Sequence, residues 1–465
     1  MKIKKIIGLF IFTLLLTNCG KKTTQSITNP SQPNETLTIW WTRSYYAQED
    51  EALEEIITAW QNKTGKKVDF SFISPDDILK KTVNALKDGN PPDIVYGDRA
   101  DDSLTARWAW DGKLADVTDV VEPLKDVYSN AARQSVYLYN NTAQQRSTYA
   151  IPLKQQTIHI HYGREFLAAA GLREEDIPTE WNRFWAFWKQ AQDNLRAKGR
   201  EDIYSFGFPM SSEASDTHYI FEHILDAYDV QLLDEKGNLL LKNPQVRQGV
   251  IVALNWYTQL YKDGYVPNDA DNWTNASNNT TFLNQNTVLT INPSLSIPGS
   301  QREDQEVYHN QIATIGFPSE PDGEQLKQIV TIKQVLLFES SANKEIAKDL
   351  LSYLIQPENI SAYLEGSLGR YFPVMPIVAD DPFWNNPADP HISTANQQFH
   401  NLTRSNYQSL NPAYTKVQSE SVWGQAIERI IIEDVAVDEA ADEALARIEE
   451  IFAQWDFTAN GEHRN

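Results

Sequence analysis

The stretch T-L-T-I-W-W-T-R-S-Y-Y, residues 36–46, is the part of the chain that best indicates the fold. Leu37 and Ile39 stand two residues apart, which is the spacing of a half-buried strand. Four aromatic residues and one arginine follow where that strand should end. Because successive side chains of a strand point to opposite faces, Trp40 and Trp41 should diverge, so that one closes the core while the other meets a ligand.

The segments that follow alternate between helix and strand patterns. Residues 49–60 carry apolar side chains at helical spacing, and residues 68–73 alternate like a strand. A second helix is expected to end near Lys87, and a short apolar strand, residues 93–96, follows Pro91-Pro92. This rhythm predicts an α/β fold with helices on both faces of a parallel sheet. Ligands bind beyond the carboxyl ends of such strands, where residues 40–43 and Asp98 would lie.

The remainder of the chain is long enough for a second domain, because 465 residues exceed one typical core. Strands are expected around residues 149–162, 288–291, 312–317 and 329–338. The helix over residues 180–195 has a face of Trp and Phe side chains, which favours core packing. Trp273 stands alone in a polar, turn-rich segment, so it is a candidate ligand contact.

The N-terminus has the pattern of a bacterial lipoprotein signal. Three lysines precede an apolar run, residues 6–16, which is too short to cross a bilayer. Leu16-Thr17-Asn18-Cys19 then resembles a lipobox, and Cys19 is the only cysteine of the chain. We therefore expect a signal peptide over residues 1–18, a lipid on Cys19 and a flexible tether over residues 19–36. The net charge of −22 argues against a nucleic-acid partner.

The order of several short phrases resembles the family 1 extracellular solute-binding proteins of ABC transporters, the group that includes maltose-binding protein. The resemblance runs from about Leu37 to Trp455. It rests on the opening strand that ends at a Trp, and on the phrases at residues 64–68 (T-G-K-K-V), 91–93 (P-P-D), 149–152 (Y-A-I-P), 169–181 and 366–373.

This resemblance implies a type II periplasmic-binding-protein fold, in which hinge strands join two lobes that close on a sugar. The N-terminal lobe would comprise residues 37–152 and 287–326, and the C-terminal lobe residues 153–286 and 327–465. The protein would be a monomer without a cofactor, anchored through Cys19 to the outer face of the plasma membrane or periplasmic. It would deliver a disaccharide or glycosylated polyol, such as an alpha-glucoside, to the transmembrane subunits of an ABC permease.

A sugar site needs aromatic rings for the apolar sugar faces and planar hydrogen-bonding groups for the hydroxyls. The candidates that meet these needs lie at strand ends, after the hinge and in the late glycine loop. They are Trp40, Trp41, Arg43, Tyr45, Asp98, Gln155, Gln156, Asp216, Trp273, Asn292, Arg370 and Tyr371. For Asp216, capping of the helix that follows is the competing role.

Other classes of function remain open at this point. No metal-ligand spacing, phosphate loop or nucleophile motif occurs in the sequence, so neither a metal nor catalysis is expected. A glycosidase would need two carboxylates across a cleft, but 63 acidic residues make such pairs uninformative. A sugar-sensing co-receptor for a membrane signalling protein, or a receptor for a non-sugar solute, would share all these features.

Overall fold

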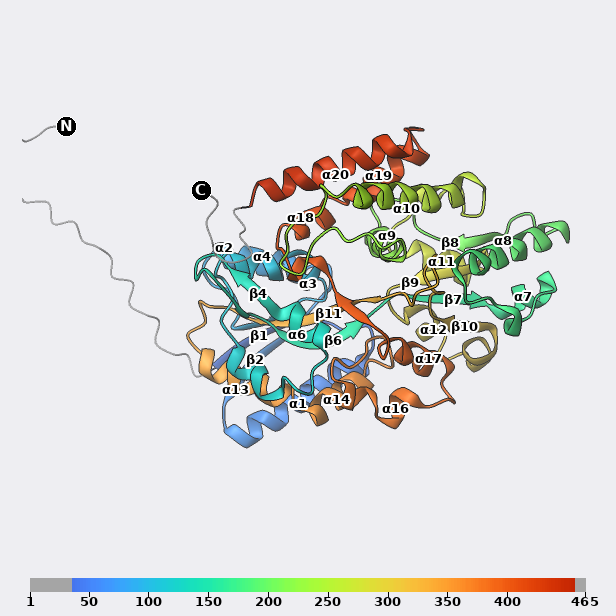
Figure 1. Cartoon of the computed structure of the whole chain (residues 1–465). Coiled ribbons are helices and arrows are strands. Elements are labelled where there is room, and N and C mark those ends of the chain that lie inside the picture. Colours follow the sequence, from blue (N-terminus) through green and yellow to red (C-terminus); the bar gives the residue numbers. More distant parts are fainter. Residues whose placement is uncertain (1–35, 456–465) are drawn as a thin grey trace, which may run out of the picture.

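Strand β1 (Thr36–Thr42) opens the part of the chain that the computed structural model describes, residues 36–455 (Figure 1). Leu37, Ile39 and Trp41 point to one face of the sheet and pack in its core, whereas Trp40 points to the other face. The predicted divergence of the two tryptophans is therefore confirmed. The predicted signal peptide, Cys19 and tether lie outside the described residues, except Thr36, which already belongs to β1.

The first lobe is built on the sheet that contains β1. The order is β12-β11-β3-β1-β2, and β6 also pairs with β11. The three N-terminal strands run parallel, and β11 is antiparallel to both β3 and β6. The other strands of this sheet are β2 (Lys67–Ile73), β3 (Ile94–Tyr96), β6 (Ile151–Gln156), β11 (Gln328–Leu337) and β12 (Thr403–Ser405).

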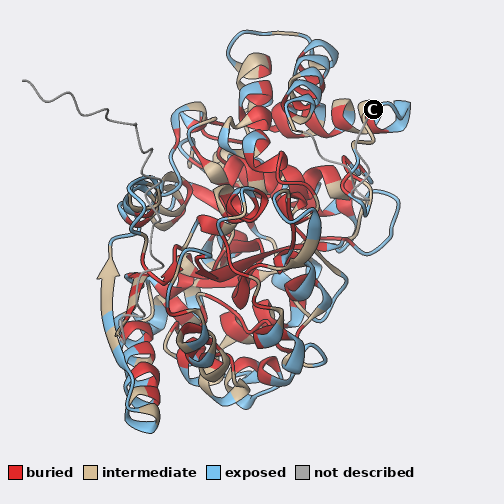
Figure 2. Ribbon diagram, turned by 90° about the vertical axis from the view of Figure 1, so that its left-hand side faces the viewer, coloured by how far each residue is buried: buried red, intermediate tan, exposed pale blue. Residues whose placement is uncertain are grey.

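Helices cover both faces of this sheet, as the alternation of elements predicts. The helices α1 (Ala47–Thr64), α13 (Lys344–Leu354) and α14 (Pro357–Glu365) pack on the face of Trp41. The helices α2 (Ile78–Lys87) and α4 (Thr105–Trp110) pack on the face of Trp40. Figure 2 shows the buried residues gathered along the sheets and the exposed residues on the outer helix surfaces.

The second lobe has its own sheet, of order β10-β7-β9-β8. Its main helices are α8 (Trp181–Ala197), α9 (Ser215–Ala227), α10 (Pro244–Lys262), α19 (Val422–Ile431) and α20 (Val437–Ala453). The aromatic face of α8 packs in this core, as its spacing predicts. The strands are β7 (His159–Gly163), β8 (Tyr204–Gly207), β9 (Thr287–Asn292) and β10 (Ile312–Ile315).

Shorter elements connect the lobes and cover their edges. They are α3 (Ala100–Ser103), α5 (Thr118–Val121), α6 (Asn130–Val136), β4 (Tyr137–Asn140), β5 (Gln145–Thr148), α7 (Arg164–Ala170), α11 (Ser277–Leu283), α12 (Ser296–Gly299), α15 (Pro376–Ala379), α16 (Pro382–Asn385), α17 (Pro390–Gln398) and α18 (Tyr414–Ser419). No helix within residues 36–455 has the length and apolarity that a bilayer crossing needs.

The predicted division of the chain between the lobes is wrong after residue 286. Strand β9 pairs with β7 and β8, and β10 pairs with β7, so residues 287–292 and 312–315 belong to the sheet of the second lobe and not to the first. Strand β11 pairs with β3, and α13 packs on α1, so residues 328–354 belong to the first lobe. The chain returns to the second lobe after β12, where Tyr407 joins the second core. Pairing partners of this kind are not encoded in the local apolar pattern.

Histidines are buried where the second sheet meets α17. His161 Nδ1 lies 3.0 Å from Thr314 Oγ1, which in turn lies 2.6 Å from His391 Nδ1. The ring of His159 lies 6.0 Å from that of Phe372. Burial lowers the pKa of both His159 and His391 to about 4.

Replacement of His159 by leucine should change how stability depends on pH. An unfolded histidine titrates near pH 6.5. Between about pH 6.5 and 4, the unfolded chain therefore binds a proton at this histidine, whereas the folded protein does not. Its contribution to stability therefore falls as the pH falls through this window. Relative to wild type, His159→Leu should gain about 1.5 kcal/mol on going from pH 6.5 to pH 5. Urea unfolding at several pH values measures this difference. The exposed His400→Leu serves as the control, and parallel pH curves for His159→Leu and wild type would contradict the prediction.

Candidate functional site

The carboxyl ends of β1 and β3 meet at one edge of the first sheet, because Trp41 pairs with Tyr96. Thr42 Oγ1 donates to the Tyr96 carbonyl over 3.1 Å and accepts from the Asp98 amide over 3.0 Å. This hydroxyl fixes the turn after β3 and so places the Asp98 side chain at the edge of the sheet, as the sequence predicts.

The Asp98 carboxylate is surrounded by donors and positive charges. It accepts hydrogen bonds from Tyr96 Oη over 2.9 Å and from Tyr371 Oη over 2.7 Å. Burial by itself would raise the pKa of Asp98, but the charges of Lys333, Lys154 and Arg370 and the Tyr371 hydroxyl outweigh it and hold the pKa well below its ordinary value. Asp98 is therefore a fixed, ionised acceptor at neutral pH.

An ion pair buried beneath Asp98 forms the base of the site. Lys154 on β6 is bonded to Glu49 on α1, and their side chains are 2% and 1% exposed. The Lys154 ammonium lies 3.9 Å from the ring centroid of Tyr371 and 4.9 Å from that of Tyr96. Lys154 thus holds the tyrosines that donate to Asp98.

The second lobe reaches this edge through α9. Tyr219 donates a hydrogen bond to Asp102 on α3 and accepts one from Gln418 Nε2 over 3.2 Å. Lys333 Nζ on β11 lies 3.3 Å from Asp101 Oδ2 and 3.9 Å from Asp102 Oδ2. The Tyr219–Asp102 bond therefore joins the two lobes directly beside the Asp98 site.

A small pocket lies between α9 and the two strands that leave the first lobe. Its lining combines amide and hydroxyl groups with one carboxylate and several apolar side chains. The lining residues are Gln156, Thr157, Ile158, Tyr219, Glu222, His223, Pro293, Ile329 and Thr331. Together with Asp98 and its neighbours, this pocket forms the candidate solute site between the lobes.

Some of the predicted site residues lie in this region. Asp98 and Tyr371 bond to each other, and Gln156 lines the pocket. The guanidinium of Arg370 lies 4.8 Å from the ring centroid of Tyr45, which is 58% exposed. These residues bring together an acceptor, a cation and an accessible aromatic ring.

The predicted tryptophans occupy other positions. Trp41 packs on Tyr96 at 4.7 Å within the first core, and Trp273 is buried in the second core. Trp40 lies beneath the Lys81 ammonium at 4.2 Å, on the opposite face of the sheet from Trp41. Their positions favour packing over solute contact.

The other predicted residues have structural partners. Arg43, which is itself exposed, pairs with the buried Asp50 at 3.2 Å. Gln155 Nε2 donates to the Pro373 carbonyl over 2.7 Å, and Asn292 Nδ2 donates to Ser296 Oγ over 2.9 Å. Asp216 lies within the first turn of α9 and makes no capping bond there, and burial raises its pKa to about 7.

The sequence analysis missed Glu49, Lys154, Tyr219 and Lys333. The available signals were two lysines in apolar segments: Lys154, directly after residues 151–153, and Lys333, within residues 329–338. A charged side chain in a buried strand is rarely without a partner of opposite charge. Residues 36–455 contain no cluster of three His, Cys, Asp or Glu side chains that could hold a metal ion.

Two α/β lobes with a polar site between them define a bilobal binding protein of the type II periplasmic class. The sequence model of the bacterial extracellular solute-binding protein family matches residues 55–394, and the chain belongs to that family. A search of curated protein sequences finds no match.

Solved structures share the fold over nearly the whole chain. The cyclic alpha-maltosyl-1,6-maltose binding protein from Arthrobacter globiformis is 18% identical with a TM-score of 0.72, over 90% of this chain and 99% of that one. A solute-binding protein from Thermotoga lettingae bound to alpha-D-tagatose is 19% identical with a TM-score of 0.68, over 90% and 99%. UgpB from Mycobacterium tuberculosis, in complex with glycerophosphocholine, is 18% identical with a TM-score of 0.69, over 91% and 99%.

Proposed function

We propose that this protein is the receptor of an ABC importer, which captures a sugar between its lobes and delivers it to a membrane permease. A disaccharide or a glycosylated polyol, such as an alpha-glucoside, is the solute class that we favour. The observation that carries the proposal is the ionised Asp98, fixed by two tyrosines, close to the charge of Arg370 and at the sheet edge that the second lobe reaches through Tyr219.

This group of side chains suits sugar hydroxyls. A carboxylate accepts from hydroxyl donors, an arginine donates to hydroxyl oxygens, and tyrosine rings pack on the apolar sugar faces. Relatives of the same fold bind maltose and alpha-D-tagatose, which supports the sugar class. Another relative binds glycerophosphocholine, so a non-sugar solute is the alternative that the comparisons favour.

We further propose that the mature protein is a monomer tethered to the cell envelope by a lipid on Cys19. The apolar segment before this cysteine supports the proposal. Fractionation of cells that express a Cys19→Ser variant tests it, since the variant should leave the membrane fraction. Retention of the variant in that fraction would contradict the anchor.

Calorimetric titration with a panel of mono-, di- and oligosaccharides, glycosylated polyols and glycerophosphodiesters tests the solute class. We expect saturable binding of one sugar with no product formed after prolonged incubation. Binding of a phosphodiester alone would transfer the proposal to the non-sugar class, and turnover of any compound would indicate an enzyme. A co-receptor would bind the sugar equally well, so uptake of the radiolabelled sugar by cells with and without the gene separates transport from sensing.

Replacement of Tyr219 by phenylalanine should weaken solute binding about tenfold. The variant loses the hydroxyl that donates to Asp102 across the lobes and accepts from Gln418, so closure gains less free energy. Calorimetry gives the change in Kd. Tyr261→Phe is the matched control, because its hydroxyl bonds within the second lobe, to the Asn268 carbonyl. Equal affinities for the two variants would show that the bond does not contribute to closure.

A further inference from the structure

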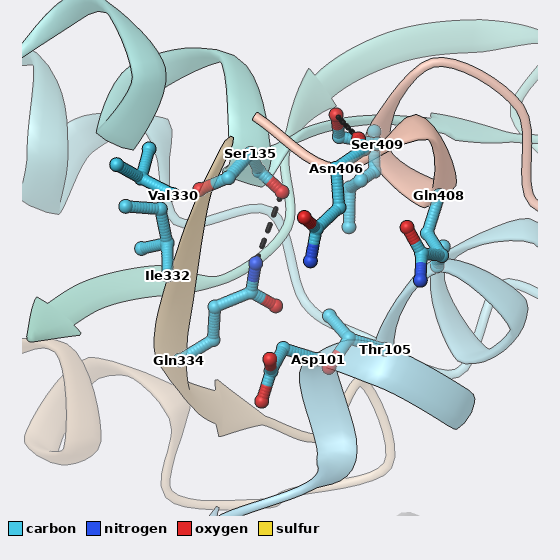
Figure 3. Close-up of a pocket in the computed structure, with 11 residues that line it drawn as sticks. Asp101, Thr105, Ser135, Val330, Ile332, Gln334, Asn406, Gln408 and Ser409 are labelled. Carbon is cyan, nitrogen blue, oxygen red and sulfur yellow. Dashed lines mark hydrogen bonds between the residues drawn. The ribbon is translucent and has the colours of Figure 1, made fainter. Parts of the chain in front are cut away.

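A second pocket, of about 310 Å³ including its mouth, lies at a gap in the edge of β11 (Figure 3). Strand β12 pairs with residues 328–330 of β11, and β3 pairs with residues 335–337, so the edge between them is left to other elements. The lining residues are Asp101, Thr105, Ala106, Ser135, Leu138, Val330, Ile332, Gln334, Asn406, Gln408 and Ser409.

The pocket walls come from both lobes. Asp101 and Thr105 lie on α3 and α4 of the first lobe. The segment from Asn406 to Ser409 contains Tyr407, which packs in the second core. Whatever occupies the pocket therefore contacts both lobes at once.

Oxygen atoms without partners line this pocket. Thr105 Oγ1, Gln334 Oε1, Asn406 Oδ1 and Gln408 Oε1 are buried and have no hydrogen-bond partner among the described residues. Thr105, Gln334 and Gln408 are only 1%, 5% and 4% exposed. A buried polar atom left unsatisfied costs about 1–3 kcal/mol, so several in one pocket point to an occupant.

The orientation of the Gln334 amide is set by its neighbour, and the amide nitrogens of Asn406 and Gln408 also have hydrogen-bond partners. Gln334 Nε2 donates to the Ser135 carbonyl over 3.0 Å, and this partner can only accept, so Gln334 Oε1 must face away from it. Asn406 Nδ2 donates to Thr331 Oγ1 over 3.3 Å, and Gln408 Nε2 donates to Gln418. The amide nitrogens are thus engaged, and their oxygens remain available to the pocket.

The charges around the pocket define what it can accept. Asp101 lies in the wall and faces Lys333 on β11 and Asp102 and Asp98 beside it. Burial and the nearby charge of Asp102 raise the pKa of Asp101 well above its ordinary value although the Lys333 ammonium opposes the shift, so the two carboxylates outweigh the one ammonium beside them. A set of neutral oxygens with one carboxylate suits a hard cation of low charge, whereas a divalent ion in an all-protein site takes more carboxylates.

We propose that this pocket binds one small monovalent cation, through the four unpartnered oxygens and the carboxylate of Asp101. Na⁺, K⁺ and NH₄⁺ share this chemistry. The bound ion would fasten the segment after β12 to α3 and α4, and would therefore stabilise the arrangement of the lobes seen here. The inference concerns a different set of oxygens from the solute site and does not depend on which solute that site takes.

Thermal unfolding of the purified protein in different chloride salts tests the proposal. At constant ionic strength and without solute, NaCl, KCl and NH₄Cl are compared with tetraethylammonium chloride, whose cation is too large for the pocket. We expect a saturable rise of Tm with at least one small cation. Thr105→Val, which removes one unpartnered oxygen and keeps the side-chain shape, should weaken the apparent cation affinity about tenfold.

Thr258→Val is the matched control, because its hydroxyl bonds to the Leu254 carbonyl within α10 and Thr258 does not line the pocket. It should leave the cation response unchanged. Crystals grown with Tl⁺ should show an anomalous peak among the four oxygens. Equal Tm values in all salts, equal responses of the two valine variants, or ordered water alone in the pocket would each overturn the proposal. A failed sugar titration would not bear on it, since no solute is present.

Discussion

Replacement of Asp98 by asparagine is expected to weaken solute binding about a hundredfold, which corresponds to about 2.7 kcal/mol. The carboxylate is held ionised by Lys333, Lys154 and Arg370, and two tyrosine hydroxyls fix its orientation. An acceptor that is charged and fixed before the solute arrives loses little free energy on binding. Asparagine removes the charge and replaces carboxylate oxygen Oδ2 by an NH2 group, whereas its Oδ1 can still accept from both tyrosines. Calorimetric titration with the identified solute measures the effect.

Asp349→Asn is the matched control for this substitution. Asp349 also lies in the first lobe and also accepts from an aromatic side chain, Trp60 Nε1, over 2.9 Å, but it lies on α13, away from the lobe interface. Its affinity for the solute should equal that of the wild type. If Asp98→Asn binds as tightly as Asp349→Asn, the solute does not contact Asp98, and the site must be sought elsewhere between the lobes.

The first lobe shows how much of the fold can be predicted from the sequence alone. Leu37, Ile39 and the helix over residues 49–60 predict β1 and α1 because the apolar periods are local and regular. The turn after β3 places Asp98 at the sheet edge because parallel strands end together. Each of these predictions depended only on residues that are close together in the sequence. The structure confirms β1, α1 and the position of Asp98 at the sheet edge.

The errors arise where a position depends on partners far along the chain. The sequence of β9 predicts a buried strand, but no feature of the neighbouring residues indicates that it pairs with β7 and not with β3. Trp273 stands in a polar segment and was therefore a candidate ligand contact, yet it packs in the second core. Exposure of an aromatic residue is set by the elements that surround it in space, which its sequence neighbours do not reveal.

The site residues that were missed are charged groups whose roles arise in pairs. Lys154 is informative only with Glu49, which is 105 residues away, and Tyr219 only with Asp102, which is 117 residues away. The oxygens of the second pocket come from α4, β11 and the segment after β12, so no contiguous sequence motif could predict them. Candidate sites at strand ends can thus be predicted from the sequence, whereas contacts between the lobes cannot.

Replacement of Lys154 by methionine is expected to lower the free energy of unfolding by about 3–5 kcal/mol, which is the largest stability effect that we predict. The substitution retains most of the apolar contact with Tyr371 and Tyr96 but leaves the buried carboxylate of Glu49 without its counter-charge. An uncompensated charge in this environment is costly because it has lost its hydration. Urea unfolding followed by tryptophan fluorescence measures the change.

The double variant Glu49→Gln/Lys154→Met distinguishes a charge effect from a packing effect. It removes both charges, so it should recover most of the stability that Lys154→Met loses. Lys348→Met supplies the surface comparison, since Lys348 pairs with the 61% exposed Asp119 at 2.9 Å and should cost less than about 1 kcal/mol. Lys154→Met and Lys348→Met of equal stability would show that Glu49 is hydrated in solution. A double variant no more stable than Lys154→Met would show that Lys154 acts mainly through its cation–π contacts with the tyrosine rings and not through its pairing with Glu49.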